Sequence, residues 1–253
     1  FYNWVSDPAM LTELRSVAPR IATYADLDRE VMGLAEGALA SGRLLSGAYY
    51  LRLAEFFLFA GDPRKKQVRQ RFLQTLRGVY GNELPEPHRV PADGCVLRAY
   101  RFEATSPRGR LVLFGGFDSY IEEWWPMFRH LNGLGFDLTV FEGPGQGACI
   151  EEDGVAFSPE WERPVRAILD HFNLEAVTLI GLSLGGGLAI RAAASEPRVS
   201  RVVAIDILTD FLEVVLRQTS PVVRAALRAL LMIKARGIID ALVRTQMRRS
   251  PVV

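Results

Sequence analysis

Apolar side chains recur at intervals of three and four residues through the first 81 positions, which is the spacing of one face of a helix. The clearest such face, over residues 27–41, carries Leu27, Val31, Leu34, Ala35, Ala38 and Leu39. A strongly apolar helix is predicted over 46–59, and a third begins at a Gly61-Asp62-Pro63 cap and runs to about Gly78. The pattern therefore predicts an N-terminal helical module.

The pattern changes in a proline-rich connector over residues 81–87, where no periodicity remains. Beyond it, short apolar runs alternate with helical stretches. The runs predicted as strands span 95–103, 111–114, 137–141, 176–180 and 199–207, the first of them in a hairpin that turns at Asp93-Gly94. This alternation predicts an α/β fold with a parallel sheet and right-handed crossovers. We place the domain boundary in the connector, which gives a helical module over 1–81 and an α/β domain over 82–253.

A serine flanked by glycines stands where one predicted strand gives way to a helix, in the sequence Gly181-Leu182-Ser183-Leu184-Gly185-Gly186. This arrangement is typical of a nucleophile elbow, a tight turn that exposes the serine hydroxyl. Glycines suit the flanking positions because larger side chains would collide with the backbone there. The turn also directs the Leu184 N–H to the point where an oxyanion would form. The alternative interpretation is a glycine-rich helix start with a structural serine.

A second turn, Gly115-Gly116-Phe117, follows the strand predicted over 111–114. In an open α/β sheet, ligands bind outside the carboxyl ends of the strands, so this turn and Ser183 are expected at one site. We predict that the Phe117 N–H is the second oxyanion donor beside that of Leu184. The Glu142-Gly143-Pro144-Gly145-Gln146-Gly147 loop after the next strand is interpreted as structural.

The residues after the second turn include an acid and several aromatic side chains. Asp118, Tyr120 and Trp124 are candidates for the wall of a substrate pocket. The alternative is that Trp124 and Trp125 pack the following helix onto the sheet. The pattern leaves both interpretations open.

A serine nucleophile needs a base, and the sequence offers no clear candidate for it. The chain has three histidines, His88, His130 and His171, and all precede Ser183. In folds with this elbow, the acid and the histidine follow the nucleophile along the chain. We therefore predict that none of the three acts as the base. The residues after the connector are also too few for a complete domain of this kind with a lid, so we expect the last strands and the base beyond Val253.

Four features of the chain together resemble one branch of the α/β hydrolases. They are the Ser183 elbow, the Gly115-Gly116-Phe117-Asp118-Ser119 turn, the glycine-rich loop after Glu142 and the helix Gly47-Ala48-Tyr49-Tyr50-Leu51-Arg52-Leu53-Ala54-Glu55-Phe56. That branch includes the fermentation-respiration switch protein, dihydroxypseudooxynicotine hydrolase and fungal hydrolases that shorten polyketide pigment precursors. The resemblance spans nearly the whole chain. It implies a Ser-Asp-His triad, hydrolysis without a metal or an organic cofactor, and often cleavage of a carbon–carbon bond next to a ketone.

The resemblance also implies a helical lid after the sixth strand, which fits the helical stretch over 209–253. This chain departs from the pattern because no Asp and His follow that lid. Of the carboxylates after the sixth strand, Asp206, Asp210 and Glu213 are candidates to assist the reaction. Their alternative role is to cap the lid helices or to lie on the lid surface.

The composition of the chain limits the kinds of partner that it is expected to bind. A formal net charge of +1 gives no argument for nucleic acid or for a membrane surface. Cys95 and Cys149 have neither metal-ligand nor disulfide spacing, and no apolar run reaches the ~18 residues of a transmembrane helix. We expect a cytoplasmic protein with a small-molecule substrate and no metal. The apolar residues of the first helices exceed what a helical hairpin buries, which predicts packing on the α/β domain or a homodimer contact.

The leading hypothesis is a serine hydrolase that forms an acyl-enzyme on Ser183. Its substrate would be an acyl ester, or a polyketide-like or aromatic compound cleaved at a carbon–carbon bond beside a ketone. Two alternatives stay open. The same acyl-enzyme serves acyl transfer or cyclisation when another nucleophile replaces water. A protein without its base would instead be a non-catalytic, hydrolase-like scaffold.

Overall fold

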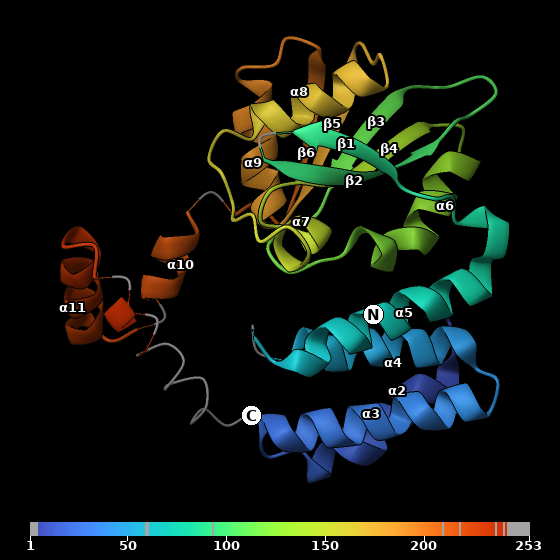
Figure 1. Cartoon of the computed structure of the whole chain (residues 1–253), viewed down its shortest axis with the longest axis vertical. Coiled ribbons are helices and arrows are strands. Elements are labelled where there is room, and N and C mark those ends of the chain that lie inside the picture. Colours follow the sequence, from blue (N-terminus) through green and yellow to red (C-terminus); the bar gives the residue numbers. More distant parts are fainter. Residues whose placement is uncertain are drawn as a thin grey trace.

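Six strands form a single sheet in the order β1-β2-β4-β3-β5-β6 (Figure 1). The strands are β1 (His88–Ala92), β2 (Cys95–Phe102), β3 (Arg110–Phe114), β4 (Asp137–Glu142), β5 (Val177–Leu182) and β6 (Val199–Ile205). They belong to a computed structural model that describes residues 5–58, 61–92, 94–208, 210–217, 219–235, 237–239 and 241. Every predicted strand is present, with small differences at its ends.

Strands β4, β3, β5 and β6 run parallel to one another, as the alternation of strands and helices predicted. The β1–β2 hairpin adds two antiparallel strands at one edge, because β2 pairs antiparallel with β4. The predicted parallel sheet is therefore a mixed one, and Asp93 of the predicted hairpin turn lies outside the described residues. At the other edge, β6 pairs only with β5 within the described residues, and its Val202, Val203 and Ile205 side chains are exposed.

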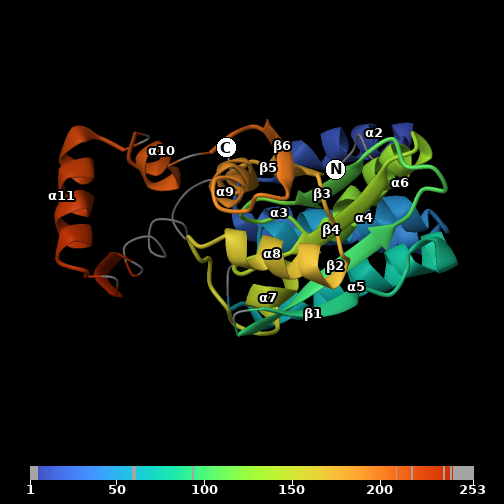
Figure 2. The same ribbon diagram turned by 90° about the horizontal axis from the view of Figure 1, so that it is seen from above.

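Successive side chains of a strand point to opposite faces of the sheet, so the apolar residues of each strand are divided between two cores. In β3, Leu111 and Leu113 belong to one core, while Val112 and Phe114 belong to the other. The elements that cover these faces are the 3-10 turn η3 (Ile121–Trp124), α6 (Trp125–Gly133), α7 (Gly147–Glu151), α8 (Glu162–His171) and α9 (Leu184–Ala193). Helix α6 and the N-terminal helices contribute to the first core, and α7, α8 and α9 to the second. The sheet is thus the middle of three layers (Figure 2).

Within the described residues, four helices precede the sheet and share its first core. They are α2 (Pro8–Val17), α3 (Tyr24–Ala40), α4 (Leu44–Phe56) and α5 (Pro63–Tyr80), with the 3-10 turns η1 (Ala18–Arg20) and η2 (Gly81–Glu83). Asp7 and Asp62 are the N-caps of α2 and α5, and a proline follows each of them. Helix α4 is the most enclosed, since nine of its thirteen residues are buried. The helical segment therefore shares a hydrophobic core with the α/β domain rather than standing apart from it.

Among the described residues after β6, two helices with assigned bounds stand apart from the sheet in Figures 1 and 2. They are α10 (Phe211–Arg217) and α11 (Pro221–Met232). Both lie in the stretch predicted as a lid over 209–253, of which Thr209 and residues 218, 236, 240 and 242–253 lie outside the described residues. Along the part of the chain that the structure describes, no helix combines the length and the hydropathy needed to cross a bilayer.

Deletion of residues 1–81 should uncover the apolar residues of the α/β domain that share a core with the helices. These residues include Tyr120, Ile121 and Trp125, and an exposed apolar surface of this kind promotes association. We expect the shortened chain to aggregate in size-exclusion chromatography and to lose its cooperative thermal transition. A shortened chain that stays monomeric and unfolds cooperatively would contradict the shared core.

Candidate active site

Ser183 lies at the turn from β5 into α9, with backbone angles of φ 56° and ψ −120°. A positive φ strains a residue that is not glycine, and such strain is concentrated at functional sites. The Ser183 N–H donates to the Ile205 carbonyl (2.7 Å), and the Ser183 carbonyl accepts from the N–H groups of Gly186 (2.9 Å) and Leu208 (3.2 Å). The elbow conformation is therefore held by β6 and by the segment that follows it.

The glycines around Ser183 are required by the close approach of two backbones. A Cβ atom at Gly181 would lie 2.0 Å from the Gly185 carbonyl oxygen, and one at Gly185 would lie 2.3 Å from the Gly115 carbonyl oxygen. Real Cβ atoms do not make contacts this short. Because Gly115 belongs to the turn after β3, the second elbow glycine is required by contact with another strand.

The turn after β3 adjoins the elbow. Strands β3 and β5 are parallel neighbours, with Phe114 opposite the first elbow glycine. A Cβ atom at Gly116 would lie 3.0 Å from the Ser183 Cβ and 3.4 Å from the Leu184 nitrogen. Phe117 is the next residue. The two predicted oxyanion donors, the N–H groups of Leu184 and Phe117, therefore belong to adjoining turns.

Gln146 holds the peptide groups of this second turn. Its Nε2 donates to the carbonyl oxygens of Gly115 (2.6 Å) and Gly116 (3.0 Å), while its Oε1 accepts from the Gly143 N–H (3.1 Å). In a trans peptide the C=O and N–H bonds point in opposite directions. The bond to the Gly116 carbonyl therefore directs the Phe117 N–H away from Gln146. The sequence predicts a structural loop here, but gives no sign that its amide reaches the turn after β3.

Glu142, at the end of β4, connects two other segments of the site. Its carboxylate accepts from the N–H groups of Ile121 (3.3 Å) and Ala148 (2.8 Å). Burial raises the pKa of this carboxyl to about 7, and the nearby charge of Glu122 adds to the shift. These contacts join η3 to α7, which supports the structural role predicted for the loop.

A cavity of about 270 Å³ lies over the elbow. It is lined by Gly116, Asp118, Ser119, Glu123, Trp124, Leu182, Ser183, Ile205 and Asp206. Ser183, Asp118, Trp124 and Asp206 were candidates from the sequence, and the structure brings these four together. Ser119 belongs to the turn that carries the family resemblance, but the sequence assigns neither Ser119 nor Glu123 a role at the site. Among the described residues, no group of three His, Cys, Asp or Glu side chains converges as a metal site.

Of the three candidate carboxylates after the sixth strand, the structure places one at the cavity. Asp206 directly follows β6, has a φ of 52° and lines the cavity. Asp210 instead accepts a hydrogen bond from the Glu213 N–H (2.8 Å) at the start of α10, and Glu213 forms an ion pair with Arg228 (2.9 Å). These contacts match the alternative role, in which Asp210 caps helix α10 and Glu213 lies on the surface of the helices after β6.

Two of the candidate aromatic residues contact other parts of the fold. The Phe117 side chain is 52% exposed and stacks on Phe157, with ring centroids 5.7 Å apart, so its predicted role depends on its backbone N–H. Tyr120 is buried, and its hydroxyl donates to Glu55 Oε1 (2.7 Å) of α4. It is not among the residues that line the cavity, because its side chain extends toward the N-terminal helices.

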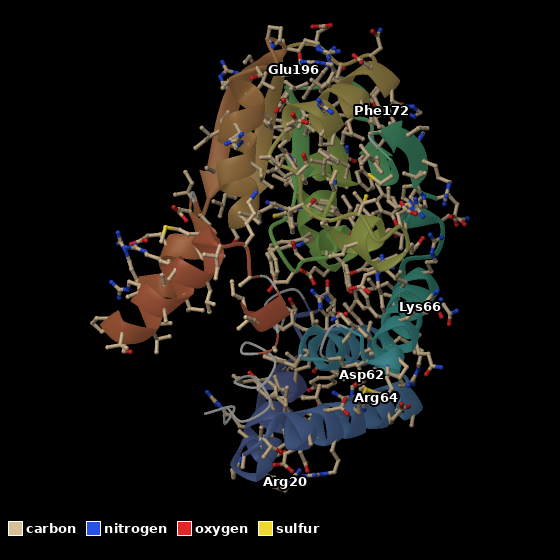
Figure 3. All side chains as sticks on the ribbon, turned by 60° about the vertical axis from the view of Figure 1, so that its left-hand side comes forward. Arg20, Asp62, Arg64, Lys66, Phe172 and Glu196 are labelled. Atoms are coloured by element: carbon tan, nitrogen blue, oxygen red, sulfur yellow. The ribbon has the colours of Figure 1, made fainter. Side chains whose placement is uncertain are left out.

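The three histidines lie away from the cavity. His88 begins β1 and His171 ends α8, and their ring centroids are 5.6 Å apart. This pair adjoins Phe172, which lies before the amino end of β5 (Figure 3). His130 lies on α6. All three are described, and none lines the cavity or hydrogen-bonds to Ser183.

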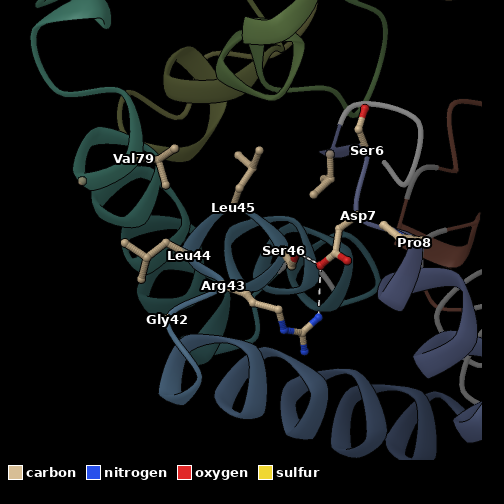
Figure 4. A pocket seen from close by; sticks show the side chains of 11 residues that line it. Ser6, Asp7, Pro8, Gly42, Arg43, Leu44, Leu45, Ser46 and Val79 are labelled. Atoms are coloured by element: carbon tan, nitrogen blue, oxygen red, sulfur yellow. Dashed lines mark hydrogen bonds and ion pairs between the residues drawn. The ribbon is translucent and has the colours of Figure 1, made fainter.

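A second and more open cavity, of about 650 Å³, lies in the helical segment (Figure 4). It is formed by the start of α2, the turn between α3 and α4, and the end of α5. Asp7 there accepts from Ser46 Oγ (2.5 Å) and Arg43 Nη1 (3.1 Å), and Arg43 also pairs with Glu13 (2.5 Å). Both carboxylates are thus paired with the one guanidinium, and Ser183 does not line this cavity, so the elbow cavity is the better candidate site.

Comparison with known proteins shows the same family. Residues 109–230 match the family model described as the alpha/beta hydrolase fold. Hydrolase acrC of Aspergillus aculeatus is 32% identical over 227 residues, which cover 74% of this chain and 52% of that protein. This chain belongs to the α/β-hydrolase family. The 2,6-dihydropseudooxynicotine hydrolase of Paenarthrobacter nicotinovorans is 29% identical over 175 residues, which cover 66% of this chain and 47% of that hydrolase.

Solved structures of α/β hydrolases have the same fold. The AbyA5 structure matches with a TM-score of 0.61 at 26% identity, over 71% of this chain and 52% of that one. The crystal structure of 2,6-dihydroxy-pseudo-oxynicotine hydrolase matches with a TM-score of 0.56 at 25% identity, over 78% and 61% of the two chains. The predicted family and fold class are confirmed. The chain spans about half the length of the curated relatives it matches.

Substitution of Gly185 by alanine tests the contact between the two turns of this α/β hydrolase. The added Cβ atom would lie 2.3 Å from the Gly115 carbonyl oxygen, so one backbone must move. We expect Gly185→Ala to lower the free energy of unfolding by about 1–3 kcal/mol, measured by thermal denaturation.

Gly37→Ala is the matched control, because nothing lies within 4 Å of a Cβ atom at that position in α3. We expect this control to be as stable as the parent, or about 0.4–1 kcal/mol more stable. Equal stability of Gly185→Ala and the control would show that the two turns do not touch as described.

Proposed function

We propose that this protein is a serine hydrolase and that Ser183 is its nucleophile. The observation that carries the proposal is the strained Ser183 turn, which lies in a cavity wall beside the turn after β3. In this mechanism the Ser183 hydroxyl attacks a substrate carbonyl, and the N–H groups of Leu184 and Phe117 bind the oxyanion. Expulsion of the leaving group gives an acyl-enzyme, which water then hydrolyses.

The attack needs a base that takes the Ser183 proton and later returns it to the leaving group. The three histidines of this chain are remote from the cavity, so we propose that a histidine from outside these 253 residues serves as the base. Asp206 is the carboxylate we propose to assist, because it lines the cavity at the end of the strand next to Ser183. We assign no catalytic part to Asp210 or Glu213.

Two kinds of bond fit this mechanism. In an acyl ester, the leaving group departs as an alcohol after it receives the proton. In a ketone, the carbon–carbon bond breaks and the departing carbon takes the proton from the protonated base. The resemblance to the branch that cleaves carbon–carbon bonds favours the second reaction, and Trp124 in the cavity wall favours a polyketide-like or aromatic substrate. A cytoplasmic location and a homodimer stay predictions.

Acyl transfer and cyclisation share every step up to the acyl-enzyme. They differ from hydrolysis only in the nucleophile that takes the acyl group. Product analysis in water enriched in heavy oxygen separates them, because only hydrolysis places that oxygen in the released acid.

Replacement of Ser183 tests whether this residue is the nucleophile. The experiment uses the protein in the form in which its source produces it. We expect Ser183→Ala to abolish labelling by a fluorophosphonate and to lower kcat by about a millionfold. We expect the free energy of unfolding to change by less than about 0.5 kcal/mol. Intact mass, turnover and thermal denaturation measure these three quantities.

Ser195→Ala is the control, because Ser195 is exposed after the end of α9. Turnover by Ser183→Ala within tenfold of the parent would overturn the assignment. An unchanged protein that neither reacts with the probe nor turns over esters or ketones would instead support the non-catalytic scaffold.

A further inference from the structure

Helix α4 of the N-terminal segment extends a buried arginine to the segment that follows the second turn. Arg52 is 1% exposed. Its Nη2 donates to the Asp118 carbonyl (2.5 Å), its Nε pairs with Glu123 Oε2 (2.5 Å), and its Nη1 pairs with Glu55 Oε2 (2.6 Å). The guanidinium also lies 4.4 Å from the centre of the Tyr120 ring. One side chain therefore contacts segment 118–123 at its beginning, its middle and its end.

Two neighbours of Arg52 on α4 contact the same segment. The Tyr49 hydroxyl donates to the Glu123 carbonyl (2.7 Å). Glu55 accepts from the Tyr120 hydroxyl and also pairs with Lys65 (2.7 Å). Tyr49 and Glu55 are both fully buried. These contacts fix segment 118–123 against the helix through its backbone as well as its side chains.

The contacts matter for the site because Phe117 directly precedes this segment. On its other side, Gln146 holds the carbonyl of Gly116 (3.0 Å), which shares a peptide group with the Phe117 nitrogen. Arg52 holds the carbonyl of Asp118. The candidate oxyanion donor is thus bracketed by two buried side chains, one from the loop after β4 and one from α4. Asp118 and Glu123 also line the elbow cavity.

A lysine could not replace this arginine. The guanidinium presents several N–H donors in one rigid plane, whereas an ammonium group is a point charge on a flexible stem. Three acceptors around one buried cation need that fixed geometry. Loss of one contact also leaves a buried carboxylate or carbonyl without its donor, which is costly.

We propose that Arg52, assisted by Tyr49, is a positioning residue that sets the place of the Phe117 N–H relative to Ser183. This inference rests on the proposed function. The N-terminal helices then act on the rate of the chemical step, and do more than complete the first core.

The test compares Arg52→Lys with the unchanged protein, produced as in its source. We expect the rate at which a fluorophosphonate labels Ser183, counted per folded molecule, to fall about tenfold to a hundredfold, because a displaced donor binds the oxyanion poorly. We expect kcat to fall by a similar factor while KM stays within about threefold. Circular dichroism and thermal denaturation give the folded fraction.

Arg198→Lys is the matched control. Arg198 also pairs with two carboxylates, Glu196 (2.8 Å) and Asp170 (2.6 Å), but it lies before the amino end of β6, away from Ser183. We expect this variant to label at the parent rate. Tyr49→Phe serves if Arg52→Lys does not fold, because it removes only the hydroxyl that holds the Glu123 carbonyl, and we expect about a threefold slower labelling.

The outcomes separate the two proposals. If the parent is labelled and Arg52→Lys is labelled at the same rate, the positioning role is overturned and the serine hydrolase proposal stands. If Arg52→Lys does not fold, a parent-like rate in Tyr49→Phe has the same meaning. A parent that is not labelled at Ser183 would overturn both. A loss of stability with an unchanged rate per folded molecule would show that Arg52 is structural only, which also overturns the proposal.

Discussion

The backbones that follow β3 and β5 meet with no room for a side chain between them, and the site depends on this contact. A Cβ atom at Gly185 would overlap the Gly115 carbonyl oxygen, and one at Gly116 would press on Ser183. The contact exists because β3 and β5 are parallel neighbours with their ends level. The register of β3 and β5 thus determines the geometry of the candidate oxyanion site, because a slip of either strand would separate the two turns.

Buried polar side chains surround this contact, and each is costly unless its partners are present. Gln146 and Glu142 approach from the loop after β4, while Arg52 approaches from α4. Several of their partners are backbone groups of the turns themselves. The energy that satisfies these buried groups therefore also holds the turns in place, so the fold cannot relax locally without exposing an unpaired charge or amide.

Local patterns in the sequence predict much of this arrangement. The elbow is predictable because strand, glycines and helix are contiguous around Ser183, and the strands are predictable because apolar runs end in turn residues. Tyr120 shows the limit: its aromatic ring suggests a pocket wall, but its hydroxyl bonds to Glu55, which is 65 positions away. Arg52 likewise lies in a helix whose apolar pattern gives no indication of which loop it contacts.

The carboxylates after β6 show the same limit over a shorter span. Asp206 and Asp210 are close in sequence, but only the first belongs to the end of a strand. The second directly precedes α10, which leads away from the sheet. The spacing of apolar residues predicts that a helix follows the strand. The direction in which that helix runs depends on tertiary packing, which a local sequence pattern does not show.

Among the described residues no strand pairs with the outer edge of β6, and this edge determines where another strand could join the sheet. Its exposed Val202, Val203 and Ile205 side chains and its outer row of peptide groups form a surface on which another strand can pair. A strand added there in the parallel sense would end beside Asp206, since the carboxyl ends of parallel strands lie at one edge of a sheet. Any residue just after such a strand would arrive next to the elbow cavity, so the direction of edge pairing decides which foreign side chains can reach Ser183.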